Sequence, residues 1–450
     1  MVVPRFPRWL HAAGSLLLLL AGSVVAQSGM HVVLAPGDAW PDLTPGMTVT
    51  LEPGMYEGPW EIDVPGVTVE AEGAVLTGPR EGSALLLTAP NVTVRDLRIE
   101  DAGTVADLYA PDAAVWLLTC DDCRLEGVST SGTPAGARIE ASQGVVIASS
   151  AFRGGPEGPG VTAYEAGDLQ LVDVTIDGFL DGAYVERSDG VAIRAATVRG
   201  AARYGLHVMF GAVLDVADSV VAGGGVGSAV MYGRDARLEG NTFSGHVGPL
   251  AYGLLVHEME NVSARMNTLA GNTVGALVVS SRGVNLEGND VSGSGTGLVV
   301  QRTPGEVASV VTMTGNRFAG NVADVAVDDP DAAVTMRGNA FDRATRLDRD
   351  GDGVSDVSVL PTSTFAVLQT RQPDVSLFAL SPGVRLWEAA EASVPALRLA
   401  TLHDPAPVIL SGEGAWRVSG SGLVLILGVV ALVVGLVVPA VRAGVPRGTA

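Results

Sequence analysis

The sequence has no lysine and few basic residues of any kind. Its 28 basic residues are all arginine and face 49 acidic ones, giving a formal net charge of −21. A surface this acidic repels phosphate and excludes sequence-independent binding of nucleic acid. The two cysteines are too few for a four-cysteine zinc site. Aromatic residues make up only 5%, whereas glycine occurs 58 times, which favours many short, tightly stacked strands.

The middle of the chain carries an internal repeat. An apolar residue recurs there in steps of 24, 22, 22, 23, 26, 22, 27 and 23 residues, at Phe152, Ile176, Val198, Val220, Phe243, Leu269, Val291, Phe318 and Phe341. In later coils a turn-forming Gly-Asn pair precedes this residue, as in Gly240-Asn241 and Gly288-Asn289. The period is too long for a hexapeptide solenoid, and no helical or propeller signature accompanies it. We therefore predict an all-β fold, a right-handed parallel β-helix with about 22–27 residues per coil.

Both ends of the chain indicate a membrane. Residues 1–26 have arginines, a leucine-rich stretch and small residues at a cleavage position, the pattern of a signal peptide. Residues 420–442 contain enough uncharged, mostly apolar residues for one transmembrane helix, and a buried core helix is the alternative. Arg442 and Arg447 place the tail, residues 443–450, in the cytoplasm. We expect an extracytoplasmic, periplasmic protein anchored to the cytoplasmic membrane by this helix.

The segments between these ends differ in pattern. We assign residues 27–345 to the β-helix, 346–360 to an Asp-rich loop, and 361–417 to an irregular, partly helical C-terminal arm. Within the arm, residues 384–394 have helical periodicity, with Leu386, Trp387, Ala390 and Val394 near one side. A short helix of this kind usually folds onto its own domain, and presentation to a partner is the alternative.

Stacking the repeats in register predicts columns of side chains. Aligning the glycines of successive coils places Val185, Val208, Val230, Val256 and Val278 in an interior column. The following residues then form an outward column, consisting of Glu186, Met209, Met231, His257 and Val279. His207 and Met259 are two residues from members of this column and should share its face.

The outward column is rich in soft metal ligands. Thioether and imidazole groups together favour Cu(I), so His207, Met209, Met231, His257 and Met259 are candidate copper ligands. The alternative is that these side chains form a protein contact or an ordinary tolerated surface. A slip of one residue in register would also turn the column inward.

Two further motifs offer binding chemistry. Cys120 and Cys123 form a lone C-x-x-C, which favours a turn-closing disulfide or an inert pair over a soft-metal site. The Asp-rich loop has carboxylates at alternate positions with intervening glycines, like the first half of a calcium loop. Its candidate calcium ligands are Asp348, Asp350, Asp352, the Val354 carbonyl and Asp356. The glutamate that closes an EF-hand is missing, and a solvated acidic turn is the alternative.

Several stretches together resemble the NosD family. They are residues 203–210, 229–232, 238–241 and 251–255 of the central repeats, the Asp-rich loop, residues 381–386, and Asp404-Pro405. The resemblance implies a non-enzymatic periplasmic accessory protein in nitrous oxide reductase maturation. Its implied partners are a membrane ABC transporter, a copper chaperone lipoprotein and nitrous oxide reductase itself. A copper ion would be a transient cargo in this role. The calcium ion predicted from the Asp-rich loop would be structural. The membrane span departs from the family, whose members are usually soluble.

Other functions fit the same scaffold. Parallel β-helices also include polysaccharide lyases, epimerases and hydrolases that act on exported carbohydrate, and fold alone does not decide between them. Uronate chemistry needs cations and a base, whereas this chain lacks lysine. Its acids, such as Glu186 and Glu258, look isolated, and Asp181 and Asp189 lie near turns where acids are normally solvated. A purely structural or adhesive solenoid is the third class.

Overall fold

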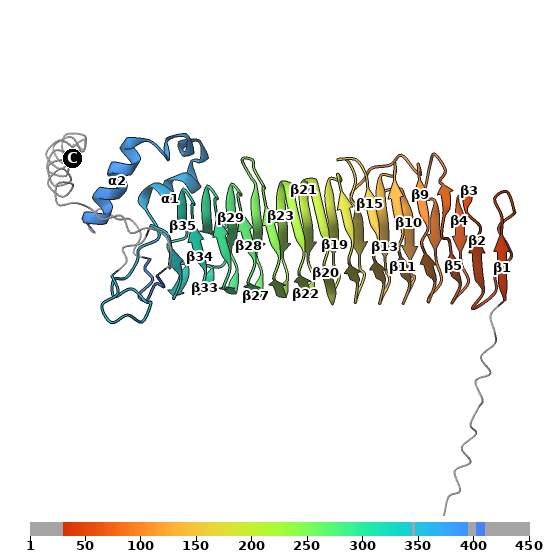
Figure 1. Ribbon diagram of the computed structural model, residues 1–450, viewed down its shortest axis with the longest axis horizontal. Helices are drawn as coiled ribbons and strands as arrows, with labels where there is room; N and C mark the ends of the chain where they lie inside the picture. The colour runs from red at the N-terminus through yellow and green to blue at the C-terminus, as the bar shows by residue number, and fades with distance from the viewer. Residues whose placement is uncertain (1–29, 344–346, 395–401, 410–450) are drawn as a thin grey trace, which may run out of the picture.

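The chain winds into a long stack of parallel coils. The computed structural model describes residues 30–343, 347–394 and 402–409. Coils follow one another along the long axis in Figure 1, from β1 at the red end to β35 at the blue-green end. All strand pairs are parallel, and they form a 14-stranded and a 23-stranded sheet. The prediction of an all-β, right-handed parallel β-helix is therefore confirmed.

Each coil contributes strands to three faces. The first face is the 14-stranded sheet of β1 (His31–Leu34), β2 (Thr48–Leu51), β5 (Thr68–Glu70), β8 (Thr93–Arg95), β11 (Arg124–Glu126), β14 (Val146–Ala148), β17 (Gln170–Val172), β20 (Val191–Arg194), β22 (Ala212–Ala217), β24 (Arg234–Glu239), β27 (Glu260–Arg265), β30 (Arg282–Glu287), β33 (Val310–Thr314) and β36 (Ala333–Arg337).

The second face contains β3 (Gly54–Glu57), β6 (Ala74–Thr77), β9 (Arg98–Glu100), β12 (Ser129–Ser131), β15 (Ala151–Arg153), β18 (Thr175–Asp177), β25 (Thr242–Ser244), β28 (Thr268–Ala270), β31 (Asp290–Ser292), β34 (Arg317–Ala319) and β37 (Ala340–Phe341). The third face contains β4 (Trp60–Ile62), β7 (Leu85–Leu87), β10 (Ala113–Leu118), β13 (Ala135–Glu140), β16 (Val161–Tyr164), β19 (Asp181–Glu186), β26 (Tyr252–His257), β29 (Val274–Val279), β32 (Thr296–Gln301) and β35 (Ala323–Val327). The long strands β21 (Thr197–Met209) and β23 (Val220–Met231) run through both faces and join them into one sheet.

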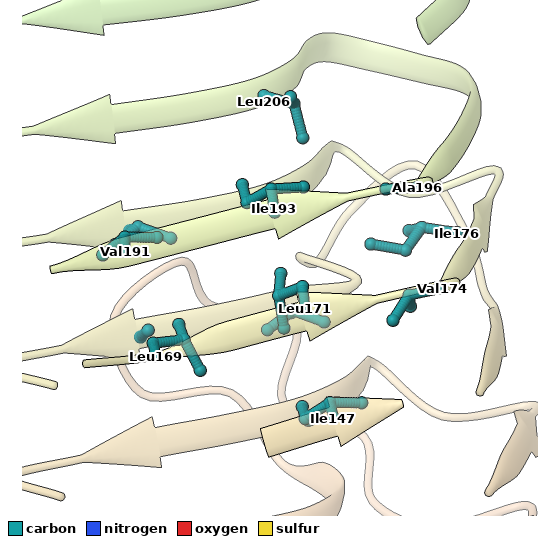
Figure 2. Packing of buried hydrophobic residues seen from close by; sticks show 14 of the residues in the cluster. Ile147, Leu169, Leu171, Val174, Ile176, Val191, Ile193, Ala196 and Leu206 are labelled. Atoms are coloured by element: carbon teal, nitrogen blue, oxygen red, sulfur yellow. The ribbon is translucent and has the colours of Figure 1, made fainter. Parts of the chain in front are cut away.

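The core is a set of interior columns, one residue per coil. Ile147, Leu171 and Ile193 stack directly in register on the first face (Figure 2). The predicted valine column on the third face is also confirmed, from Val185 to Val278, with every member buried. Each such side chain contributes about 1.5–3 kcal/mol of hydrophobic stabilisation when it leaves water. A coil thus buries its apolar side mainly against its two neighbours.

The repeat predicted from the sequence lies on the second face and is in register, with one correction. Val198 pairs with Val221, which pairs with Phe243, so the repeat residue of that coil is Val221 and not Val220. Val221 is buried, whereas Val220 is exposed. The step from Val198 to Val221 is one residue longer than the sequence alignment assumed. The extra residue lies in the bulge between Ala201 and Tyr204, where the register shifts.

The asparagines of the Gly-Asn pairs, together with Asn267, form a buried ladder. Asn241, Asn267, Asn289, Asn316 and Asn339 stack from coil to coil, and the side chain of each donates to the amide oxygen of the next. The same amide groups donate to backbone carbonyl oxygens of the preceding turns, as Asn289 does to Ala264 over 2.9 Å. Asp404, which is fully buried, ends the ladder by accepting from the Asn339 backbone and side chain. The segment 402–409 therefore closes the polar ladder of the solenoid.

The C-terminal arm packs at the end of the stack. It contains α1 (Thr364–Arg371), the 3₁₀ helix η1 (Pro373–Phe378) and α2 (Pro382–Ser393). The predicted helix at 384–394 corresponds to α2, whereas α1 and η1 were not predicted. Ala366 of α1 packs on Ala323 and Ala326 of β35, and Arg371 pairs with Asp328 at 2.6 Å.

The predicted membrane segments are not part of this description. The signal peptide, 1–26, the span, 420–442, and the tail, 443–450, lie outside the described residues. None of the helices within 30–343, 347–394 and 402–409 is long and apolar enough to cross a membrane.

The asparagine ladder gives a stability prediction. Asn289→Ala removes the side-chain donor of the Ala264 carbonyl and the acceptor of both the backbone and the side-chain N–H of Asn267, whereas Asn316 Oδ1 still accepts from the Asn289 backbone. Each buried polar group left without a partner costs about 1–3 kcal/mol, so we expect about 3 kcal/mol lower stability in denaturant unfolding. Asn285→Ala, at an exposed position of the same coil, is the control and should change stability by less than about 0.5 kcal/mol. Equal effects of the two variants would contradict the role given to the ladder.

Candidate functional site

The predicted outward column exists on the third face. Glu186 pairs with Met209, Met209 with Met231, Met231 with His257, and His257 with Val279. Neighbouring members are therefore one strand spacing apart, about 4.8 Å. The column is covered more than an outward column should be, since Met231 is buried and Met209 and His257 are only partly exposed. Met231 belongs to a second, smaller apolar cluster, and Met209 packs against that cluster.

Aromatic rings at the neighbouring corner flank this column. Phe210 and Tyr232 stack with ring centroids 5.0 Å apart, and Tyr232 lies 5.1 Å from the His257 ring. Both occupy left-handed backbone positions, φ 54° and 56°, where the coil turns from the third face to the first. The His257 Nε2 atom lies 3.2 Å from Glu258 Oε1 and 3.4 Å from Thr303 Oγ1. The imidazole is thus held at its outer nitrogen by groups that a metal ion would have to displace.

Met259 does not share this face, so this part of the prediction is wrong. Its side chain is buried in the main core, and its Sδ accepts from the Gly233 amide at 3.1 Å. The reason is the corner: β26 ends at His257, and Glu258 adopts φ 52° before β27 begins. Strict alternation holds only inside a strand, so a residue beyond the corner points into the solenoid. Met259 is therefore not available beside His257 on the outer face.

His207 lies on the predicted face but in a polar network of its own. Its Nδ1 atom is 2.8 Å from Asp181 Oδ2, and Arg203 Nε donates to Asp181 Oδ1 over 2.8 Å. An ionised carboxylate only accepts, so Nδ1 carries a proton and Nε2 is the atom left for a ligand. His207 is only 4% exposed, and its Nε2 has no hydrogen-bond partner among the described residues.

Asp181 and Arg203 are site residues that sequence reasoning missed. Asp181 was expected to be solvated near its turn, but it is fully buried. Burial by itself would raise the pKa of its carboxyl, yet the hydrogen bonds from Arg203 and His207 and their charges hold that pKa below its usual value. The sequence did contain one signal that this position is buried. Asp181 directly precedes Gly182, one of the glycines aligned between coils, and the residues at the same position of the next coils, Tyr204, Val226 and Tyr252, are apolar or aromatic.

Tyrosines enclose this network. The rings of Tyr184 and Tyr204 lie 5.0 and 4.2 Å from that of His207. The Tyr184 hydroxyl donates to Glu186, so Glu186 is not an isolated acid as expected. Tyr109, from the connection between β9 and β10, packs edge-on against Tyr184 with centroids 5.9 Å apart. The same connection accepts a hydrogen bond from Thr162 at Leu108. A strap from an earlier coil therefore covers the region beside His207.

The Asp-rich loop brings three of its predicted ligands together. Carboxylate oxygens of Asp348, Asp350 and Asp352 all lie within 4.8 Å of one another. The backbone amides of Gly351 and Gly353 donate to Asp348, which lowers the pKa of its carboxyl. Asp356 is outside this group of three and instead accepts from the Arg349 amide over 2.8 Å. Val354 forms a β-bridge with Val408, which connects the loop to the segment that caps the asparagine ladder.

The two cysteines are joined. Cys120 and Cys123 form a disulfide and are both fully buried. Of the alternatives left open by the sequence, the turn-closing disulfide is the one present. A bonded pair has no thiolate to offer, so it does not contribute ligands to the outer face.

The comparisons with known proteins bear on the coils that carry these side chains. Residues 145–352 match the family model of NosD, described as a periplasmic copper-binding protein. The resemblance to NosD is confirmed. The NosD match covers just under half of the chain and includes Asp181, the Met209–His257 column and the first part of the Asp-rich loop, up to Asp352. No curated protein sequence matches the chain.

Solved structures similar to this one are also β-helices. The periplasmic alginate epimerase AlgG has a TM-score of 0.49 and 13% identity over 66% of this chain and 77% of its own. The A-module of the Azotobacter vinelandii mannuronan C-5 epimerase AlgE6 scores 0.47 with 15% identity, covering 65% of this chain and 84% of that one. Tailspike protein 3 of bacteriophage CBA120 scores 0.48 with 13% identity, covering 66% and 53%. Likeness at this level carries no inference about activity.

The buried Asp181 network predicts a pH-dependent stability. Asp181→Asn removes the charge that pairs with Arg203 and His207, and we expect a loss of about 2–4 kcal/mol near pH 7. This is less than a fully buried pair would lose, because Arg203 is partly exposed. Since folding lowers the Asp181 pKa, the pair stabilises the protein above the ordinary carboxyl pKa. The difference from wild type should therefore shrink as pH falls through the lowered pKa.

Denaturant unfolding at a series of pH values measures this difference. Asp177→Asn, an exposed acid on β18, is the matched control and should leave both the stability and its acid limb unchanged. A loss that is the same at every pH would contradict the charge pairing.

Proposed function

We propose that this protein is a membrane-anchored periplasmic accessory protein for copper-site assembly in nitrous oxide reductase, and not an enzyme. In this role it works with an ABC transporter of the cytoplasmic membrane and a copper chaperone lipoprotein, and the reductase is the final client. The NosD match over residues 145–352 supports a periplasmic, copper-related role. The named partners follow from the family resemblance and are part of the proposal.

The observation that carries the proposal is the in-register stack of Met209, Met231 and His257. Two thioethers and an imidazole on adjacent strands form a soft donor set suited to Cu(I). The His257 Nε2 atom has Glu258 and Thr303 at 3.2 and 3.4 Å, neighbours that a metal ion can replace. Weak retention of this kind suits a protein that passes copper on.

His207 has a supporting position in the same proposal. A histidine that ligates a metal usually donates its other ring N–H to a carboxylate, as His207 does to Asp181. Its Nε2 is free of hydrogen bonds within the described part of the chain, but the surrounding rings keep it from solvent. We assign His207 a second ligand position, which is more protected from solvent than that of His257. Met209 lies two residues after His207 on β21.

A second candidate function is a β-helix enzyme acting on exported carbohydrate. The observation that favours it is the buried Asp181–His207 pair with Arg203 beside it, because Arg203 supplies the cation that the lysine-free sequence seemed to lack. It ranks second because the His207 side chain is only 5% exposed, so a polymer cannot reach Nε2 in this conformation. Incubation with polyuronates tests it: release of unsaturated ends or C5 inversion, lost in His207→Gln, would establish the enzyme.

Copper binding is the first test of the proposed function. We expect the mature full chain to bind Cu(I) in anaerobic titration against a chromophoric chelator. Replacing Met209 and Met231 by leucine and His257 by glutamine removes the donors and should weaken binding by at least about tenfold. The substitutions preserve side-chain volume, so thermal unfolding should change little.

A control variant carries the same three substitutions elsewhere. Met55, Met266 and His31 are exposed thioethers and an imidazole away from the column, and their replacement should leave Cu(I) affinity unchanged. Equal affinity of the column variant and the control would remove this face from copper handling.

We also propose a structural calcium ion in the Asp-rich loop. The three clustered carboxylates support it, and the β-bridge from Val354 to Val408 would transmit the ion's effect to the end of the solenoid. Calcium should raise the unfolding free energy by about 2.7 kcal/mol when the free ion exceeds its dissociation constant about a hundredfold. Asp350→Asn with Asp352→Asn should abolish this shift, whereas Asp374→Asn, an exposed acid of the arm, should retain it. No calcium-dependent shift in wild type would leave the loop a solvated turn.

A further inference from the structure

Helix α2 is packed with its polar side inward. Glu391 is only 3% exposed and Glu388 is half-buried, whereas Leu386 and Trp387 are 51% and 49% exposed. The sequence pattern predicted that Leu386 and Trp387 would fold onto the domain. That expectation is wrong for these two residues, and Val384 is the only large apolar residue of α2 classed as buried.

The N-terminus of α1 accounts for this orientation. The Thr364 amide donates to Glu391 Oε2 over 3.1 Å, and Ser363, the N-cap of α1, donates to Glu388 Oε1 over 3.3 Å. The first backbone N–H groups of a helix lack partners inside it, and the helix dipole attracts negative charge there. The carboxylates of Glu388 and Glu391 supply both the hydrogen-bond acceptors and the negative charge. Leu386 lies on the opposite side of the helix from both carboxylates, so it faces away from α1 once they are fixed. Trp387, four residues before Glu391, lies above that residue and donates to it, with the rest of its ring half-exposed.

The arm exposes several large apolar side chains that are close together in the sequence. Leu377 and Phe378 at the end of η1, Leu380 in the turn, and Leu386 and Trp387 of α2 are all exposed. Leu377 is 88% exposed, which is unusual for a large aliphatic side chain in a folded element. We call these five residues the arm surface. Single exposed apolar residues need no explanation, but five large ones within eleven residues of one short arm call for a partner.

The position of the predicted span indicates what covers the arm surface. Ile409 is the last described residue, and ten residues, 410–419, separate it from the predicted span. Ten residues reach at most about 36 Å, so an anchored chain keeps this end of the solenoid near the bilayer. The arm lies at that same end of the stack (Figure 1). A segment that spans the bilayer cannot at the same time cover the arm surface.

We propose that the arm surface inserts into the interfacial layer of the membrane that holds the anchor. The chemistry fits this layer: leucine and phenylalanine enter the acyl boundary, and tryptophan is favoured at the headgroup level. The Trp387 indole N–H already donates to Glu391 Oε1 over 2.6 Å, so its ring can leave water without an unpaired donor. This inference rests on the membrane anchor of the proposed function, but not on copper binding.

Site-specific fluorescence on the full mature chain in vesicles tests the contact. Both native cysteines are in the disulfide, so an introduced cysteine can be labelled alone. Leu377→Cys and Leu386→Cys report from the arm surface, and Met55→Cys, exposed on β3 at the opposite end of the solenoid, is the control. Each carries an environment-sensitive dye in vesicles of phosphatidylethanolamine and phosphatidylglycerol. An apolar face of this kind enters about 5–10 Å, within reach of a spin label placed shallowly on the lipid chain.

We expect the two arm labels to shift to the blue, to be quenched by the spin-labelled lipid, and to be protected from aqueous iodide. The Met55→Cys label should behave in the opposite way. Arm labels quenched by iodide as strongly as the control would overturn the proposal. Labels shielded from both quenchers would also overturn it, because a second copy or another protein segment would then be the cover.

Flotation of the vesicles separates this result from a failure of the anchor. A chain that floats with the lipid but keeps its arm labels in water refutes only the arm contact. A chain that does not float refutes the anchor and, with it, the insertion of the arm surface. Neither outcome depends on copper loading, so the copper-handling role is judged separately by the Cu(I) titration.

Discussion

In-register stacking of parallel coils is the constraint on which the rest of this structure depends. No coil can bury its own apolar side, so each strand is stable only when the same position of the next coil lies directly over it. Glycine is required where neighbouring coils approach closely: a Cβ on Gly182 would lie 2.4 Å from the Gly205 carbonyl oxygen. The asparagine ladder fixes the register at a second position, since its amides bond only when the coils are aligned. Asp404 then accepts from the side chain of Asn339, the last asparagine of the ladder, which would otherwise lack this partner.

The same register that builds the core also builds the candidate copper surface. Once Val208, Val230 and Val256 are stacked inside, the residues that follow them must stack outside. Three soft side chains distant in sequence thus become neighbours at no additional conformational cost. The corner limits the column, because the left-handed residue Glu258 turns the next side chain, Met259, into the core. A solenoid can therefore present a row of ligands along its axis, but not around a corner.

The arm follows a different rule, in which helix ends decide the packing. Glu388 and Glu391 bind the N-terminus of α1, and burial together with the charge of Glu391 raises the pKa of Glu388. Charged residues inside and apolar residues outside are costly for a protein surrounded only by water. The arrangement is reasonable when the outer side meets a lipid surface. The end of the solenoid would then be held to the membrane by two elements, the span and the arm.

The sequence alone determined the solenoid, because coils that stack on one another need equivalent residues at equivalent positions, and these residues recur in the sequence once per coil. It predicted the valine column, the outer Met209–Met231–His257 column and α2. It erred by one residue at Val220, because the bulge between Ala201 and Tyr204 adds a residue to the preceding part of that coil. It could not predict the fate of Met259, Asp181 or Leu386. Those depend on where a corner turns the chain, on which charges meet across coils, and on which side of α2 the end of α1 attracts. Periodicity carries information along the chain, whereas these contacts join residues with no common spacing, so only the tertiary structure decided them.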